Sequence, residues 1–128
     1  MVAEEVNPIL VVIDGPFERA ELERVLGTEF KVTTTEDTAG ALRALAGRAF
    51  DAVVIDLELR GETAKTVYEF LQTAAPRLAE RAVIFGSGAR DPELAEWALG
   101  FGKKYVRRED VFGLLEVVRE VATAEWQS

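Results

Sequence analysis

The segment "DAVVIDLELRG" spans residues 51–61 and decides how the chain folds. Four apolar residues, 52–55, run directly into Asp56, after which the sequence turns polar. A continuous apolar run of this length is typical of a strand buried on both faces of a parallel sheet. A carboxylate at the end of such a strand is poorly solvated unless another group holds it. The segment therefore predicts a buried parallel strand and makes Asp56 the first candidate functional residue.

The rest of the chain repeats this arrangement. Short β-branched runs alternate with segments of helical period, and the predicted strands are 8–13 ("PILVVI"), 30–34 ("FKVTT"), 51–56, 82–86 ("AVIFG") and 104–107 ("KYVR"). Between them, Pro16 suits a first helical turn and Gly27 a helix end, the third helix ends before Pro76, and Asp91 with Pro92 begins the fourth. Five βα units with short connections predict an α/β fold with a parallel sheet and helices on both faces.

Composition and charge limit the possible functions. The 128 residues fit one domain, 1–128, with a predicted core at about 8–122. The net charge of −8 argues against nucleic acid and anionic membrane as partners. Without Cys or His, thiol chemistry, structural zinc and His-based catalysis are excluded. No apolar run approaches the ~20 residues that span a bilayer, and the acidic start "MVAEEVNP" does not resemble a signal peptide, so we expect a cytoplasmic protein.

Polar side chains follow the predicted strands at their carboxyl ends. Asp14 follows the first strand, Asp56 the third and Ser87 the fourth, and Arg107 and Arg108 follow the fifth. In doubly wound sheets the ligand site lies at this edge. Two carboxylates in one pocket need a cation or must share a proton, whereas a hydroxyl with a guanidinium suits an oxyanion. The set is coherent as a metal-assisted site in which a carboxylate accepts a phosphoryl group.

These residues carry a family resemblance. Over about residues 8–122 the chain resembles the receiver domain of bacterial two-component response regulators, in "ILVVID", "DAVVIDLELRG", "AVIFGSG" and "KKYVRRED" and in their order and spacing. The resemblance implies a flavodoxin-like (βα)5 three-layer sandwich with sheet order 2-1-3-4-5. It also implies a phosphorelay signalling module that is not an enzyme, apart from self-catalysed phosphotransfer and dephosphorylation.

The resemblance assigns roles to individual residues. Asp56 is the implied acceptor of a phosphoryl group from a histidine kinase or phosphotransfer protein, and Ser87 is the hydroxyl that binds that group, with Gly88 leaving room beside it. Tyr105 is the implied switch aromatic. The implied Mg²⁺ ligands are Asp14, Asp56 and the backbone carbonyl of Glu58. An effector protein or a second copy would then bind the face formed by the fourth and fifth predicted helices and the fifth strand.

Three departures from the family pattern favour an alternative. Of the family's two paired acids only one is present: Ile13 replaces the first if Asp14 is the second, and Gly15 replaces the second if the register slips by one. Either way the Mg²⁺ site is weakened. Arg108 stands at the family lysine, and its fork is not equivalent to a compact ammonium. Glu109 replaces the proline after that lysine, so we expect a trans bond there. The neighbouring Arg107 is expected to be solvated. A pseudo-receiver, an interaction module without efficient phosphorylation, is therefore the alternative, and a flavodoxin-like cofactor-binding protein is a remote one.

Each candidate residue also has a structural interpretation. Asp56 alone could be a turn acid, Ser87 part of a turn, Tyr105 simple packing, and Arg108 a solvated strand end. The aromatic side chains at the end of the sequence offer either a docking patch or cover for the sheet, and cover is expected for at least half of them. They are Trp97, Phe101, Phe112 and Trp126.

Overall fold

A computed structural model of the protein describes residues 6–88 and 90–124. Its strands are β1 (Pro8–Val12), β2 (Lys31–Thr35), β3 (Ala52–Asp56), β4 (Ala82–Phe85) and β5 (Tyr105–Val106). All four strand pairs are parallel, and the sheet order is β2-β1-β3-β4-β5. The predicted flavodoxin-like doubly wound fold and its 2-1-3-4-5 order are confirmed.

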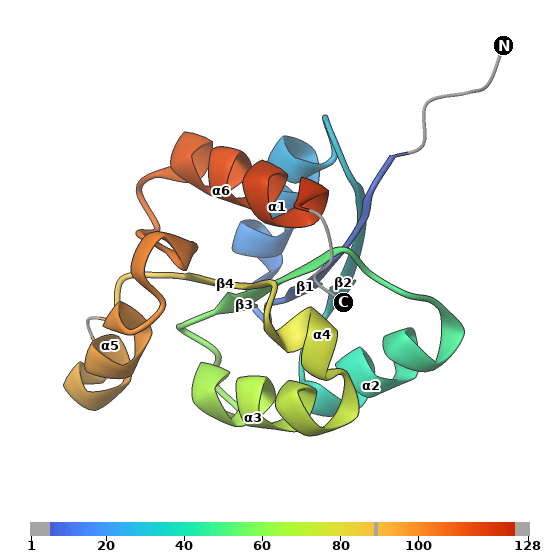
Figure 1. The fold of residues 1–128 in the computed structure, drawn as a ribbon. Helices are drawn as coiled ribbons and strands as arrows, with labels where there is room; N and C mark the ends of the chain where they lie inside the picture. The colour runs from blue at the N-terminus through green and yellow to red at the C-terminus, as the bar shows by residue number, and fades with distance from the viewer. Residues whose placement is uncertain (1–5, 89, 125–128) are drawn as a thin grey trace, which may run out of the picture.

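The helices form two layers around the sheet (Figure 1). They are α1 (Pro16–Leu26), α2 (Thr38–Gly47), α3 (Ala64–Ala74), α4 (Pro76–Ala79), α5 (Pro92–Leu99) and α6 (Val111–Thr123), with a 3₁₀ turn, η1 (Gly102–Lys104), before β5. Helices α1 and α6 lie together on one side, and α2, α3 and α4 lie on the other. No helix among the described residues is long and apolar enough to cross a membrane.

Alternation along the strands divides the core between the two layers. Ile9 and Val11 of β1 pack with α1 and α6, whereas Leu10 and Val12 pack with the residues under α2 to α5. All of these side chains are buried. This pattern is expected for strands covered on both faces, since successive side chains point to opposite sides. The three central strands are therefore covered on both faces, and their carboxyl ends lie together at one edge of the sheet.

Helix ends follow the local signals, with one exception. Pro16 lies in the first turn of α1, Gly27 caps its end, and the Asp91 carboxylate accepts from the backbone N–H of Leu94 at the start of α5. The third helix ends before Pro76 as predicted, but the chain then forms the short helix α4, which was not predicted. Proline at a first helical turn is favourable, so the same residue ends one helix and starts the next.

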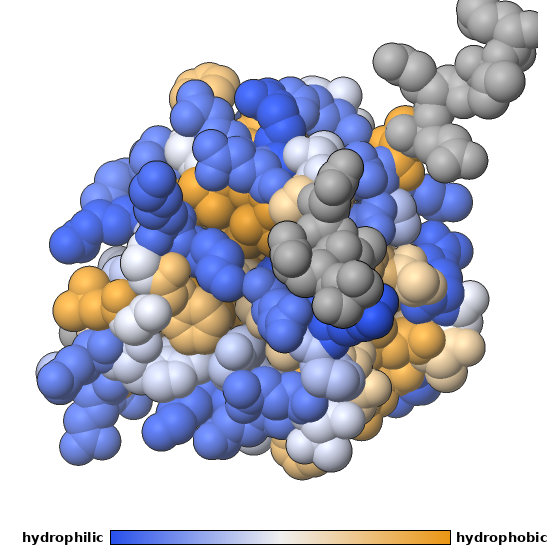
Figure 2. Space-filling view, viewed as in Figure 1, coloured by the Kyte–Doolittle hydropathy of each residue, from blue (hydrophilic) through white to orange (hydrophobic). Residues whose placement is uncertain are grey.

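Large apolar side chains also remain at the surface. Hydrophobic areas in the view of Figure 2 are separated by hydrophilic ones. The exposed apolar residues are spread over the ends and outer faces of the helices and the start of the chain: Val6, Phe17, Leu42, Phe70, Leu99 and Phe112. Trp97 and Phe101, in contrast, pack edge-to-face against Tyr68 of α3, with ring centroids 5.9 and 5.0 Å from that of Tyr68. Their predicted role as cover is consistent with this packing, whereas Trp126 lies outside the described residues.

Candidate functional site: a carboxylate and oxyanion pocket at the sheet edge

The carboxyl ends of β1, β3, β4 and β5 surround a cavity of about 280 Å³. Its lining includes four of the five strand-end residues that the sequence singled out, all except Arg107, together with other charged side chains from the connecting loops. The lining residues are Asp14, Gly15, Glu18, Asp56, Glu58, Arg60, Ser87, Arg90 and Arg108. Residues up to 94 positions apart in the sequence (14 to 108) therefore share one pocket, as expected for parallel strands whose ends meet at one edge.

The register of β3 against β4 determines which loop residues meet. Asp56 lies beside Phe85 in the sheet, and the backbone N–H of Leu57 donates to the Phe85 carbonyl at 2.7 Å. Glu58 and Ser87, which lie two residues beyond Asp56 and Phe85 respectively, are therefore neighbours. Glu58 lies in the turn that follows β3, and its backbone N–H donates to Oδ1 of Asp56, which keeps the two acids close together.

Asp56 is buried, with 3% of its surface exposed. Its Oδ1 accepts from the backbone N–H of Glu58 at 3.0 Å and from Nη2 of Arg108 at 2.6 Å. Burial raises its pKa to about 6, and the nearby charge of Glu58 acts in the same direction, although the backbone N–H of Glu58 and the charge of Arg108 oppose the change. The bond from the Glu58 N–H is one that a turn acid makes, and the ion pair with Arg108 adds to it, so the functional role of Asp56 stays a prediction.

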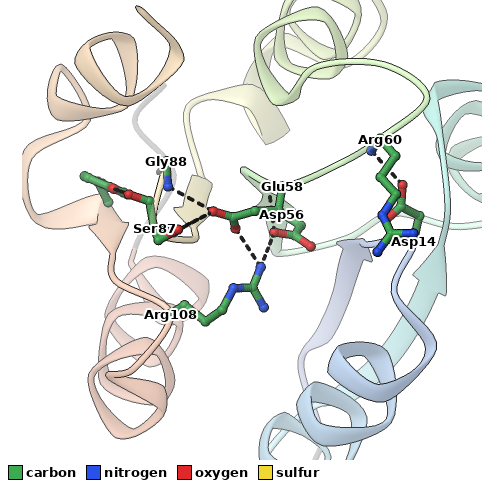
Figure 3. Close-up of polar contacts among 8 residues, drawn as sticks. Asp14, Asp56, Glu58, Arg60, Ser87, Gly88 and Arg108 are labelled. Carbon is green, nitrogen blue, oxygen red and sulfur yellow. Dashed lines mark hydrogen bonds and ion pairs between the residues drawn. The ribbon is translucent and has the colours of Figure 1, made fainter. Parts of the chain in front are cut away.

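Glu58 contributes its side chain to the pocket as well as its backbone. Its Oε1 accepts from three donors of the next loop: the Ser87 hydroxyl at 2.7 Å, the Ser87 backbone N–H at 2.8 Å and the Gly88 backbone N–H at 2.9 Å. Its Oε2 accepts from Nη2 of Arg108 at 2.7 Å. Figure 3 shows the Glu58 carboxylate lying between the Ser87–Gly88 loop and Arg108.

These contacts change the acidity of Glu58. Burial alone would raise its pKa, but hydrogen bonds from Arg108, the Ser87 hydroxyl, and the backbone N–H groups of Gly88 and Ser87 lower it to about 2. Glu58 is thus held as an anion. Sequence reasoning assigned it only a backbone role, and the signal that it missed is an acid placed two residues after Asp56, opposite a glycine-rich loop.

Arg108 joins the two acids. One nitrogen, Nη2, contacts both Asp56 and Glu58, and the guanidinium carbon lies 5.3 Å from the ring centroid of buried Phe85. Bonding to Glu58 and the negative charges of the pocket raise the pKa of Arg108, although burial opposes this. A solvated strand-end role for Arg108 is therefore wrong. Arg107, its neighbour, is exposed as predicted.

Asp14 lies in the same cavity but outside this cluster. Its Oδ2 accepts from the backbone N–H of Arg60 at 2.8 Å, and in Figure 3 the pair is separate from the group around Glu58. Ile13, the residue before Asp14, is completely buried. Asp14, Asp56 and the Glu58 carbonyl offer the hard oxygen atoms that suit Mg²⁺. Among residues 6–88 and 90–124, however, no three or more His, Cys, Asp or Glu side chains are grouped to hold a metal, so Mg²⁺ stays a prediction.

Tyr105 and the backbone around Arg108 complete the site. The Tyr105 hydroxyl donates to the Ser87 carbonyl at 3.4 Å, and its ring is half-buried against the core. This contact connects β5 to the Ser87 loop, but it does not test the predicted switching role. Within the described part of the chain there are no cis peptide bonds, so the bond between Arg108 and Glu109 is trans as expected.

Comparison with known proteins agrees with this architecture. The structure superposes on the N-terminal signal receiver domain of a two-component response regulator from Bacteroides fragilis, with a TM-score of 0.79 and 18% sequence identity, covering 94% of this chain and 100% of that one. The chain has the receiver-domain fold. A signal receiver domain of an HD domain-containing protein from Pseudomonas fluorescens Pf-5 gives a TM-score of 0.77 and 21% identity, covering 95% and 90%.

A third structure gives a similar superposition. The CheY-like response regulator receiver protein of Methanospirillum hungatei JF-1 gives a TM-score of 0.75 and 17% identity, covering 92% of this chain and 94% of that one. The sequence itself matches no protein-family model and no curated protein. The predicted resemblance to receiver domains is confirmed in the fold.

Proposed function

We propose that this chain is a receiver domain of a two-component signalling system, in which Asp56 accepts a phosphoryl group and the modified domain changes its protein partners. The observation that carries the proposal is the convergence of Asp56 with Ser87 and Arg108 in one cavity. A buried carboxylate, a hydroxyl, backbone N–H groups and a guanidinium are what transfer of a phosphoryl group to an aspartate requires.

The proposed reaction uses the groups of this pocket. A carboxylate oxygen of Asp56 attacks the phosphorus of a kinase phosphohistidine, a new O–P bond forms, the N–P bond breaks, and the imidazole nitrogen keeps the electron pair. Ser87 and Arg108 would bind the oxygens of the transferred group, where their donors stabilise its charge. Mg²⁺, held by Asp14, Asp56 and the Glu58 carbonyl, would neutralise that charge further. Asp56 is the recipient here, so the domain is not proposed as an enzyme.

The proposed partners follow from the receiver fold. A histidine kinase or phosphotransfer protein of the cytoplasm would reach the pocket from the open sheet edge. An effector or a second copy would bind the surface of α5, β5 and α6, the helices that the sequence predicted as fourth and fifth. Tyr105 of β5 contacts the Ser87 carbonyl, so this surface is connected to the pocket. Leu99 of α5 and Phe112 of α6 are exposed for such contacts.

Mass measurement tests the phosphoacceptor directly. Incubation with acetyl phosphate and Mg²⁺ is expected to add one phosphoryl group to the intact chain, and Asp56→Asn is expected to abolish the addition. Asp51→Asn, at the residue just before β3, is the matched control and should be labelled normally. An unmodified wild-type chain, or an adduct that survives Asp56→Asn, would contradict the assignment.

A pseudo-receiver is the second candidate, and a specific contact favours it. Glu58 already accepts from Ser87, Gly88 and Arg108, the donors that a phosphoryl group would use. On this hypothesis the chain binds its partner in one unmodified state. Labelling that fails with acetyl phosphate and with a phosphorylated kinase, while a partner is still bound, is the result expected for it.

A further inference from the structure

The donors of the Ser87 loop are already satisfied by an anion that belongs to the chain. Three hydrogen bonds from Ser87 and Gly88 end on Oε1 of Glu58, and Arg108 donates to Oε2. Hydroxyl, backbone N–H and guanidinium donors converging on a single carboxylate form a complete oxyanion site. The ligand of that site in the unmodified protein is the Glu58 side chain.

The backbone is shaped to accept this ligand. Gly86 has φ of 151°, and a Cβ atom at this position would conflict with Oε2 of Glu58 and lie 2.7 Å from Cβ of Leu57. Gly88 has φ of 67° and turns its N–H toward Glu58, while a Cβ there would lie 2.7 Å from Cβ of Ala95. Two glycines in conformations that other residues rarely adopt therefore allow the loop to close on the carboxylate.

We propose that Glu58 is an internal ligand that holds the loop between β4 and α5 in its anion-bound arrangement, and that an external oxyanion reaches these donors only by displacing the Glu58 carboxylate. The first half follows from the contacts alone. The second half rests on the proposed function where the oxyanion is a phosphoryl group on Asp56.

Displacement follows for the loop donors, because the Ser87 hydroxyl and the backbone N–H groups of Ser87 and Gly88 all donate to one atom, Oε1 of Glu58. The Ser87 hydroxyl has a single proton, and that proton is already directed at Oε1 of Glu58. Arg108 reaches Asp56 and Glu58 with the same nitrogen, so the guanidinium lies between the two acids. A tetrahedral anion on Asp56 would compete with a second negative charge for the same donors.

Chemical rescue tests the internal ligand without any phosphorylation. In Glu58→Ala the deleted atoms are those of an acetate ion, since alanine retains Cβ. Amide hydrogen exchange of Ser87 and Gly88, followed by NMR in metal-free buffer, is expected to accelerate about ten- to a hundredfold in the variant, in line with loss of charge-assisted hydrogen bonds. Acetate should restore slow exchange, whereas neutral acetamide and equal concentrations of sodium chloride should not.

Two further variants keep the result interpretable. Glu18→Ala removes the same charge from the same cavity, but Glu18 makes none of the contacts to Ser87, Gly88 or Arg108 described above, so its exchange rates should match the wild type. Glu58→Gln preserves the size of the side chain and should show an intermediate acceleration even if Glu58→Ala folds poorly. Unchanged exchange in Glu58→Gln, equal effects of Glu18→Ala and Glu58→Ala, or failure of acetate to rescue a folded Glu58→Ala would each overturn the proposal.

The test separates this inference from the proposed function. Acetate rescue depends on Ser87, Gly88 and Arg108, and no step of it requires a phosphoryl donor, Mg²⁺ or a reactive Asp56. A chain that shows rescue but is never labelled at Asp56 would support the internal ligand and contradict the phosphoacceptor. A wild-type chain that is labelled at Asp56 but shows fast exchange at Ser87 and Gly88 would support the phosphoacceptor and contradict the internal ligand.

Discussion

Gly86 lies directly against the carboxylate of Glu58, so that a side chain at position 86 and the observed position of Glu58 exclude each other. The conflict involves Oε2, the same oxygen that accepts from Arg108. Gly86 also has a positive φ of 151°, which disfavours any L side chain. The pocket thus depends on a glycine that carries no chemistry of its own.

Gly86→Ala is expected to lower the free energy of unfolding by about 1–3 kcal/mol, from backbone strain and from displacement of Glu58. Gly102→Ala is the matched control, because Gly102 also has a positive φ, 58°, but nothing lies within 4 Å of the added Cβ. It should cost about 1 kcal/mol. Urea denaturation of both variants measures the difference, and equal losses would mean that Glu58 moves away at no cost.

Arg108→Met is expected to destabilise the fold because Asp56 and Glu58 would lose their shared cation. The free energy of unfolding is expected to fall by about 1–3 kcal/mol. This is less than for a fully buried ion pair, because 30% of the Arg108 side chain is exposed. Arg107→Met, one residue earlier and exposed, should change the unfolding free energy by less than about 0.5 kcal/mol. Urea denaturation at constant ionic strength decides this prediction, and a neutral Arg108→Met would show that the ion pairs contribute nothing net.

The strands were predictable because apolar β-branched runs mark them directly. Residues 8–13, 51–56 and 82–86 correspond to β1, β3 and β4 within one residue at each end. The helix α4 was not predictable from Pro76, because a proline after a helical segment is read as an end, and four residues offer no period. Helix α4 packs against the core through the buried side chains of Leu78 and Ala79, and this tertiary contact is not visible in the sequence.

The site was predictable in its location and only partly in its contacts. Strand-end residues Asp14, Asp56, Ser87 and Arg108 do line one cavity, since parallel strands place their carboxyl ends together. The Ser87 hydroxyl and N–H donate to Glu58 because the sheet register places Asp56 beside Phe85, which brings Glu58 next to the Ser87 loop. Sequence spacing does not contain that register. The roles of these residues in phosphotransfer stay predictions.

The two acids of the pocket are expected to titrate in opposite directions from their ordinary values. In metal-free buffer, carboxyl ¹³C NMR should show Asp56 with a pKa of about 6 and Glu58 with a pKa of about 2. Burial is the main cause of the raised pKa of Asp56. Burial also acts to raise the pKa of Glu58, but the hydrogen bonds from Arg108, Ser87 and Gly88 outweigh it. Two pKa values near 4 would mean that the carboxylates are solvated and the cluster is open.

The same shifts predict how stability depends on pH. The pKa of Asp56 is raised from 3.8, so its contribution is fully present below pH ~4 and is lost as pH rises through about 6. The pKa of Glu58 is lowered from 4.5, so its contribution is present above pH ~4.5 and is lost as pH falls through about 2. Asp56→Asn should remove the decline between pH 4 and 6 in urea denaturation, and an unchanged decline would assign it to another group.

Competition between Glu58 and a phosphoryl group predicts a gain of reactivity on removing the glutamate. Glu58→Gln keeps the side-chain volume but removes the second negative charge beside Asp56, and it weakens the hold on Ser87 and Arg108. The initial rate at which acetyl phosphate labels Asp56 in the presence of Mg²⁺ is expected to rise about tenfold, the effect of one charge-assisted hydrogen bond. Time-resolved intact mass measures it, with Glu18→Gln as the control for charge in the same cavity. A slower reaction in Glu58→Gln than in the wild type would contradict competition. It would instead give the Glu58 carboxylate a supporting role in phosphotransfer, because labelling would have slowed although Ser87 and Arg108 were held less strongly.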